Sequence, residues 1–214
     1  MSTARRAPGG FAVEQLTTTL RTRILDGDPP PGARLVEREL VEAHGVARHT
    51  LRAALRALAA EGLVEIVPNR GARVADIGRE QLAGLFDLRT ALEVEACHLA
   101  LERDPERLRS AVRAAAADLR AVCQAPHPGW SDVVEAHAHV HTALVDSAES
   151  PRLAAAYQAL DGEMRLFLMA MRPAWTLERM ADHHDVLADD LVSHGETALR
   201  AHLADGRRSV LGDG

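Results

Sequence analysis

The placement of proline and glycine in the first 75 residues constrains the fold of this chain more than any other feature. Apolar residues in 11–25 recur at three- and four-residue steps, as on one face of a helix. The segment GDPPPG at 27–32 must end that helix, because consecutive prolines cannot continue it. Single glycines then bound two further helical segments, at about 36–43 and 47–61. This pattern predicts short helices joined by tight turns.

The pattern changes after the second of these short helices. LVEIV at 63–67 has the composition of a strand, PNRG at 68–71 is typical of a turn, and ARV at 72–74 can return as a second strand. Two short helices separated by a glycine turn resemble a helix-turn-helix, and the hairpin would be its wing. We therefore expect a winged helix-turn-helix DNA-binding domain over residues 11–75, preceded by a flexible tail at 1–10.

The helix at 47–61 carries a row of arginines. Arg48, Arg52 and Arg56 recur every four residues along one flank of it. Such a row can contact phosphates and read guanine edges, although on an isolated helix it would more often be a solvated charged face. Here the helix pair, the turn and the hairpin occur in the order that favours DNA contact. The charge distribution agrees, because residues 1–75 carry 11 Arg against 8 acidic residues, whereas residues 76–214 carry 14 against 23.

Residues 11–75 resemble the winged-helix DNA-binding domain of the GntR family. The motifs that carry the resemblance are PGxRL, ERELxxxxGVxR, LRxALxxLxxEGL and PNRGxxV. By motif match, the resemblance implies the following DNA-contacting residues: Arg38, Arg48, His49, Thr50 and Arg52, with Asn69 and Arg70 at the wing. Ala47 stands where the family prefers serine and is a poor helix cap. We interpret this and similar departures as changes in operator preference.

The second part of the chain shows no convincing strand pattern. Its helical stretches lie near 79–103, 105–123, 130–147, 151–170, 174–193 and 196–206. Aromatic residues make up only 3% of the chain, so the core must consist of Leu, Val and Ala. We predict a mainly α protein, in which residues 79–209 form an all-α helical bundle that binds an effector and dimerises.

Three histidines lie close together in VEAHAHVHTAL, the segment at 134–144. His137 and His141 are spaced i, i+4, so they point to the apolar side of the predicted helix, whereas His139 points away. Paired imidazoles at this spacing can bind one cation from a single helix. Inward histidines can also be ordinary core residues, and the spacing leaves both interpretations open.

The C-terminal helices are similar to the FCD effector domain of the FadR subgroup of GntR regulators. LFDLRTALEVEACHLA at 85–100 and HTALVDSAESPRL at 141–153 carry this resemblance, which extends over about residues 79–205. It implies a divalent metal held by one Asp and three His, with a carboxylic-acid effector beside it. Carried over, the ligands are His141, His184 and His202, with His137 in place of the aspartate and His183 as an alternative to His184.

Replacing the aspartate by a histidine changes the chemistry that the resemblance implies. A site of four imidazoles is neutral and should favour Zn, Ni or Cu over Mn. It also leaves the full charge of the metal for an anionic effector. We therefore predict a divalent cofactor, Zn or Ni.

Arg89 falls within the apolar stripe predicted for the helix at 79–103. It follows Leu85 by four residues and precedes Leu92 by three, and the same stripe includes Leu88, Ala96 and Leu99. A buried arginine needs a partner. It can form an internal salt bridge, or it can clamp an effector carboxylate, for which a guanidinium is suited. With the FCD resemblance, we assign Arg89 to effector binding.

The leading hypothesis is a ligand-responsive transcription regulator rather than an enzyme. It would bind a palindromic operator as a homodimer, because one winged helix covers only a half-site. The alternatives are a metal-dependent hydrolase with an appended DNA-binding domain, which the absence of HExxH and GxSxG motifs disfavours, and an architectural DNA-binding protein without effector. The sequence has no signal peptide, no apolar run long enough for a bilayer and no CxxC motif, so we expect a cytoplasmic protein.

Overall fold

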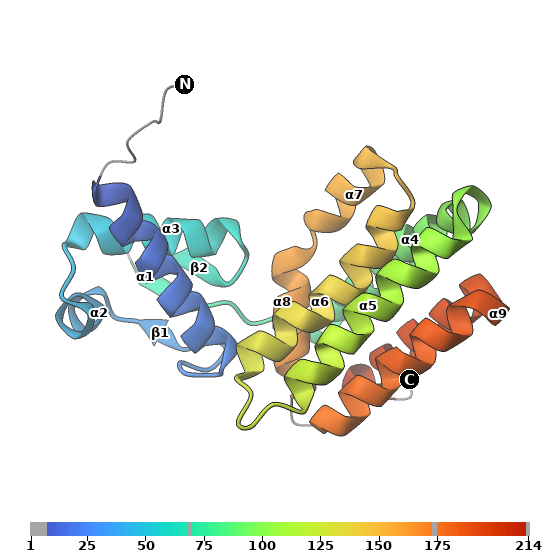
Figure 1. Cartoon of the computed structure of the whole chain (residues 1–214). Coiled ribbons are helices and arrows are strands. Elements are labelled where there is room, and N and C mark those ends of the chain that lie inside the picture. Colours follow the sequence, from blue (N-terminus) through green and yellow to red (C-terminus); the bar gives the residue numbers. More distant parts are fainter. Residues whose placement is uncertain (1–7, 68–69, 173–174, 213–214) are drawn as a thin grey trace. The chain divides into compact units, whose positions relative to one another are not determined.

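The computed structural model describes residues 8–67, 70–172 and 175–212, and the chain divides into two compact units (Figure 1). The first unit is Met1–Asp76 and the second is Ile77–Gly214. A small sheet belongs to the first unit, and the described part of the second is helical.

The first unit is a winged helix-turn-helix, as predicted. In chain order its elements are α1 (Pro8–Leu25), β1 (Arg34–Leu35), α2 (Glu37–His44), α3 (Arg48–Ala60), β2 (Val64–Val67) and β3 (Gly71–Val74). Gly45 adopts a left-handed conformation, with φ of 61°, and allows the sharp turn between α2 and α3. Leu51, Leu55 and Leu58 of α3 are at most 2% exposed and form the core against α1.

The start of α1 and the sheet of this unit go beyond the expectations, whereas the start of α3 agrees with them. Helix α1 begins at Pro8, so residues 8–10 are helical rather than part of the expected tail, and the rest of that tail lies outside the described residues. The strands form an antiparallel sheet in the order β1-β3-β2. Strand β1 was not predicted, because two residues are too few for an alternating pattern. Ala47 makes no side-chain cap at the start of α3, as expected for alanine.

The second unit is an all-α bundle, as predicted. Its helices are α4 (Arg79–Arg103), α5 (Pro105–Cys123), α6 (Trp130–Ser147), α7 (Pro151–Gln158), α8 (Asp161–Met171) and α9 (Leu177–Leu211). The single helix expected at 151–170 is two helices, because the chain turns at residues 159–160. Helix α9 is kinked at Gly195, where φ is 49° and ψ is −127°, so the break expected there is present.

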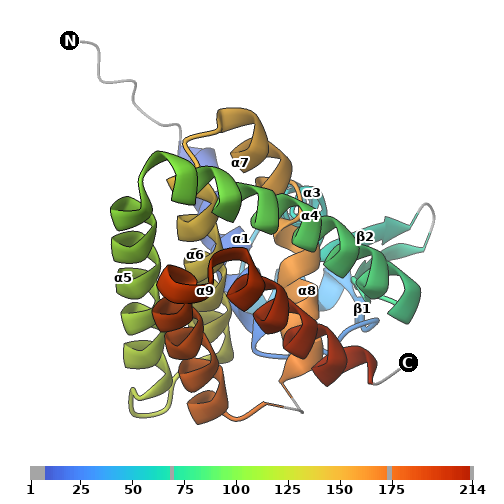
Figure 2. The ribbon, with the colours of Figure 1, turned by 90° about the vertical axis from the view of Figure 1, so that its right-hand side faces the viewer.

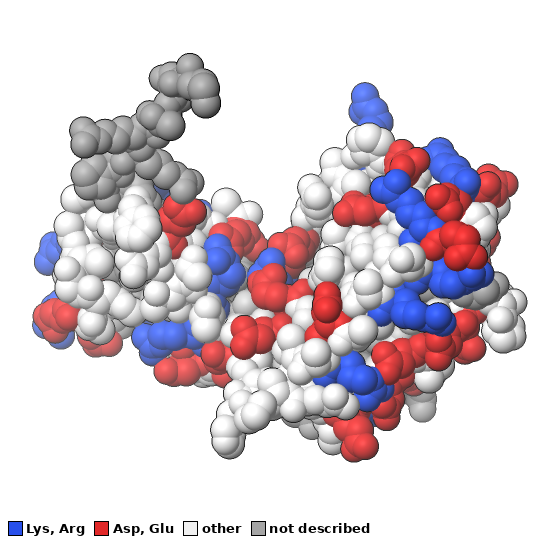
Figure 3. Space-filling model, in the orientation of Figure 1, with Lys and Arg blue, Asp and Glu red and all other residues white. Residues whose placement is uncertain are grey.

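The bundle surrounds a core to which α4, α5, α6 and α9 all contribute (Figure 2). Helix α5 packs against α6 and α9, and α4 packs against α6 and α9. On the outside, arginines of α5 meet acidic residues of α9, and blue and red side chains alternate there (Figure 3). Among the described helices, none combines the length and the apolar character needed to cross a bilayer.

The buried face of α4 differs from the predicted stripe. Leu88 is 48% exposed, and Leu92 and Leu99 are only half-buried. Arg89 and Ala96 are buried as the stripe predicted, and the helix also buries Phe86, Glu93 and Cys97, which the stripe did not include. The prediction was wrong at Leu88, and it missed Glu93 because a search for apolar periodicity counts a charged residue as exposed.

Candidate functional site

The residues expected to contact DNA lie mainly on the surface of the first unit. Arg38 lies on α2, and Arg48, His49 and Arg52 lie on α3; all four are exposed. Arg70, at the hairpin turn, is exposed as well. Arg52 donates its Nε–H to both carboxylate oxygens of Glu37, at 3.1 Å each. Because this pair is exposed, Arg52 can exchange it for a DNA contact at small energetic cost.

Thr50, which is also expected to contact DNA, does not belong to this surface. Thr50 is only 7% exposed and lies on the side of α3 that packs into the domain. Its burial leaves little of the side chain for a base or a phosphate. Asn69 lies outside the described residues.

In the second unit, buried histidines from two helices converge in the core. Helix α6 supplies His137 and His141, and α9 supplies His184 before its kink and His202 after it; all four are at most 8% exposed. On either side of the kink at Gly195, α9 brings one histidine ring near His141 of α6: the ring centroid of His184 lies 5.4 Å from that of His141, and the centroid of His202 lies 5.2 Å from it. His139 is exposed, as the helical geometry predicted.

Two overlapping groups of nitrogen ligands arise from this arrangement. One consists of His137, His141 and His184, and the other of His183, His184 and His202; within each group the ligand atoms lie within 4.8 Å of one another. His184 belongs to both groups. His183, by contrast, is partly exposed, stacks on His202 at 4.0 Å between ring centroids, and lies 3.4 Å from Asp205. The geometry therefore favours His184 over His183 as a central ligand.

Hydrogen bonds determine which nitrogen of each central histidine carries the proton. The Nδ1 of His184 lies 2.7 Å from the carbonyl oxygen of Met180, which can only accept, so Nδ1 carries the hydrogen. The Nδ1 of His141 lies 2.8 Å from the Glu93 carboxylate and donates to it for the same reason. In both neutral imidazoles, Nε2 therefore presents a lone pair.

These two lone pairs face each other. The Nε2 atoms of His141 and His184 are 3.4 Å apart, and without a hydrogen on either atom no hydrogen bond can join them. Nitrogens bound to one tetrahedral Zn at about 2.0–2.1 Å are separated by about 3.3–3.4 Å. In addition, the Nδ1 atoms of His137 and His202 are buried without a hydrogen-bond partner among the described residues. The donor set thus fits a divalent cation.

Glu93 is a functional candidate that the sequence did not reveal. It is fully buried on α4 and accepts hydrogen bonds from Arg89 Nε, from His141 Nδ1 and, at 2.9 Å, from the hydroxyl of Tyr157. Three helices thus meet at one carboxylate. Glu93 follows Arg89 by four residues, and this spacing is the one signal that was available in the sequence.

Arg89 is buried and forms the internal salt bridge that was one of its two possible roles. Its Nη2, however, has no hydrogen-bond partner among the described residues. The guanidinium therefore holds Glu93 with one side and keeps a donor on the other.

The electrostatics of the cluster keep the imidazoles neutral and Glu93 charged. Burial, together with neighbouring imidazoles, lowers the pKa of His137, His184 and His202 well below 6.5. Burial and Arg89 also lower the pKa of His141, although Glu93 opposes this. Burial alone would raise the pKa of Glu93, but Arg89 and His141 hold it at about 2. Neutral imidazoles are the form that binds metal.

Comparison with known families identifies both units. The family model described as bacterial regulatory proteins, gntR family, matches residues 12–74, and that of the FCD domain matches residues 84–205. The chain belongs to the GntR family. It is a GntR-family transcriptional regulator with an FCD effector-binding domain, as the resemblance predicted.

Relatives of this GntR protein are also transcription regulators. It is 30% identical to the transcriptional repressor GlaR of Escherichia coli over 86% of this chain and 89% of GlaR. It is 28% identical to the probable D-xylose utilization operon repressor of Paenarthrobacter nicotinovorans, over 95% of this chain and 90% of that one. None of these names describes a metal hydrolase.

Solved structures agree with this assignment. A GntR protein from Rhodococcus sp. RHA1 is 28% identical, with a TM-score of 0.69 over 94% of this chain and 98% of its own. McbR/YncC of E. coli has a TM-score of 0.66 over 92% and 93% of the two chains; at 20% identity it shows the shared fold alone.

Proposed function

We propose that this GntR regulator binds a palindromic operator as a homodimer and responds to an organic acid that binds at a metal site in the FCD domain. The observation that carries the proposal is the pair of Nε2 lone pairs that face each other at 3.4 Å in the buried core. A structural core gains nothing from two facing acceptors, whereas a cation between them satisfies both. A regulator that meets the chromosome would act in the cytoplasm.

The proposed ligands are His137, His141, His184 and His202, and the metal is Zn or Ni. All four donors are neutral nitrogens, a set that suits these ions better than Mn. When bound, the metal supplies a positive charge that attracts a carboxylate. Glu93 orients the site, because its hydrogen bond to His141 Nδ1 directs Nε2 of that ring toward His184.

Arg89 is the proposed second contact of the effector. Its unpaired Nη2 is a buried donor, and a carboxylate can accept from it. Arg89 also holds Glu93. An effector carboxylate bound to Arg89 would therefore be connected, through Glu93, to the proposed metal ligand His141. Binding of the effector would then favour one arrangement of the helices, and with it one spacing of the two DNA-binding domains.

Elemental analysis of protein purified without chelator tests the metal site. We expect near-stoichiometric metal in the wild type and in the His139→Ala variant, because His139 is exposed, and loss of metal in His141→Ala. If the protein takes up neither Zn nor Ni on titration, the proposed metal site is wrong and the histidines are ordinary core residues.

A thermal-shift screen of organic acids against the metal-loaded protein tests the effector. A compound that binds the native state raises the melting temperature by mass action. The Arg89→Met variant leaves the buried Glu93 carboxylate without its guanidinium and should therefore be less stable, but its folded fraction should bind DNA and lose this response. A normal response would give Arg89 a structural role only.

A further inference from the structure

The sheet of the first unit carries a row of charges separate from the arginines of α3, the helix expected to read DNA and therefore called the recognition helix. In the antiparallel register, Arg73 of β3 lies opposite Glu65 of β2 on one side and opposite Arg34 of β1 on the other. Residues directly opposite each other share one face of a sheet, so the three side chains form the row Glu65–Arg73–Arg34.

The single acid of this row satisfies only one of the two arginines. Arg73 donates from Nε and Nη2 to Oε2 of Glu65, at 2.8 and 2.6 Å. Arg34 is exposed, and within the described part of the chain its guanidinium has neither a hydrogen bond nor an ion pair. Like charges directly opposite each other destabilise a sheet. Glu65 offsets this repulsion at Arg73, so the row keeps one net positive charge at the exposed Arg34, which an anion would neutralise.

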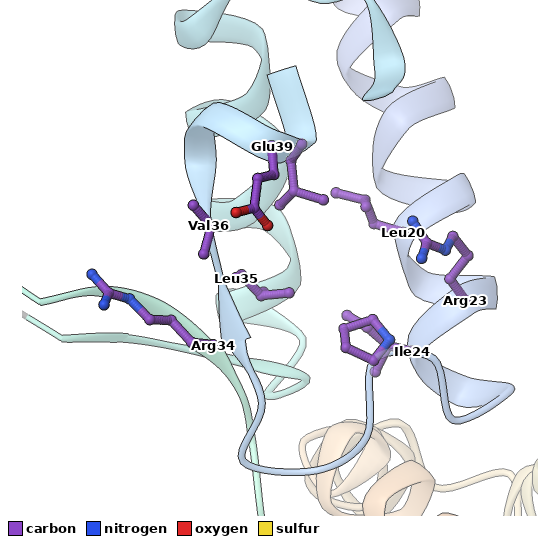
Figure 4. Close-up of a pocket in the computed structure, with 9 residues that line it drawn as sticks. Leu20, Arg23, Ile24, Arg34, Leu35, Val36 and Glu39 are labelled. Carbon is purple, nitrogen blue, oxygen red and sulfur yellow. The ribbon is translucent and has the colours of Figure 1, made fainter. Parts of the chain in front are cut away.

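The side chain of Arg34 extends away from the apolar hollow between α1 and α2. Figure 4 shows that hollow, of about 160 Å³, with Leu20, Ile24 and Leu35 on its wall and the guanidinium of Arg34 pointing away from them. Arg34 also lines a larger hollow of about 570 Å³, which contains Arg70 and Arg73 but no acidic residue. Three arginines therefore border one open depression at the hairpin.

We propose that Arg34 extends the DNA contact already expected of Arg70 into a phosphate-binding surface for the DNA backbone, in addition to the recognition helix, and that Glu65 limits this surface by holding Arg73. The inference rests on the proposed DNA binding. A DNA phosphate supplies the missing anion for Arg34, and Arg70 at the hairpin turn can contact the next stretch of the same backbone. Phosphate contacts of this kind position the protein without reading sequence.

Salt titrations of duplex binding, followed by fluorescence anisotropy, test the proposal. The probe is a 30-base-pair duplex of random sequence, since no base reading is required. Each phosphate contact contributes about 0.9 to the slope of log affinity against log salt. Arg34→Gln should lower this slope by about 0.9, so that raising salt from about 50 to 200 mM weakens the variant about 3.5-fold less than the wild type.

Glu65→Gln should act in the opposite direction. It releases Arg73, so we expect tighter binding and a slope that rises by up to about 0.9. A structural role of the row would not produce opposite changes in the two variants.

Arg23 and Asp28 supply matched controls. They form an exposed ion pair, and Arg23 lines the apolar hollow rather than the one at the hairpin. Arg23→Gln and Asp28→Asn change the net charge by the same amounts as the two test variants. Slopes of Arg34→Gln and Glu65→Gln that match those of these controls would overturn the proposal. If the wild type binds no duplex at any salt concentration, the proposed DNA binding is wrong as well. If the wild type shows a normal slope and Arg34→Gln shows the same slope, only the proposed phosphate-binding surface is wrong.

Discussion

The surface of the winged helix and the core of the FCD domain use charged residues in opposite ways. In the winged helix, arginines lie on the surface and form exposed pairs, as Arg52 does with Glu37. In the FCD domain, the Arg89–Glu93 pair is buried and each carboxylate oxygen of Glu93 is engaged. Exposed pairs exchange partners at little cost, which suits residues that must release one contact to bind DNA. Buried pairs cannot do this, which suits a site that must hold its geometry.

The largest expected effect tests the buried side of this comparison. Glu93→Gln leaves Arg89 as a buried charge without a carboxylate, so we expect the free energy of unfolding of the metal-free protein to fall by about 3–5 kcal/mol. Metal affinity of the folded fraction should fall about 10–100-fold, because His141 loses its orienting acceptor. Urea denaturation and metal competition measure the two effects. Glu95→Gln, an exposed position on the same helix, should change neither quantity.

Acid should destabilise the metal-free FCD domain. Burial lowers the pKa of His183 to about 4 in the folded state, from 6.5. The unfolded chain therefore binds this proton first, and stability is lost as the pH falls from about 6.5 to about 4, by up to about 3 kcal/mol from this residue. The other buried histidines act in the same direction. Unfolding followed between pH 7 and 4 in chelator would contradict this if stability were constant.

Arg52→Ala tests the exposed side of the comparison. If the side chain reads a base, operator affinity should fall by about 1–3 kcal/mol. Stability should change little, because the pair with Glu37 is exposed. The double variant with Arg48→Ala sharpens the test, and wild-type affinity at moderate salt would show that the recognition-helix assignment is wrong.

Gly195→Ala gives the smallest expected effect and tests the kink between the two halves of α9 that carry His184 and His202, the proposed ligands. The positive φ disfavours a side chain, and a Cβ would lie 3.0 Å from Leu101 Cδ1. We expect a loss of about 1–2 kcal/mol in stability, together with weaker metal binding as His202 shifts. Ser193→Ala, an exposed neighbour, is the control. If the Gly195→Ala protein is less stable but binds metal with unchanged affinity, the kink does not position the proposed metal ligands.

The sequence was sufficient to predict features that depend on the spacing of residues along one helix. The i, i+4 positions of His137 and His141 predicted that both point inward and that His139 does not, and burial confirms this. It was not sufficient at 151–170, where the chain turns between α7 and α8 without a proline at the turn. It also did not reveal that Thr50 is buried on α3, because a short polar side chain fits either face of a helix.

The sequence by itself determined the two domains, the family, the exposed arginines of α3 and the histidines on α6. Each follows from a local pattern, since helix periodicity and turn residues act within a few positions of the chain. Only the tertiary structure decided which nitrogens face each other, and that Glu93 joins Arg89, His141 and Tyr157. These contacts span as many as 64 residues, and desolvation determines whether such polar groups are paired or left open for a ligand.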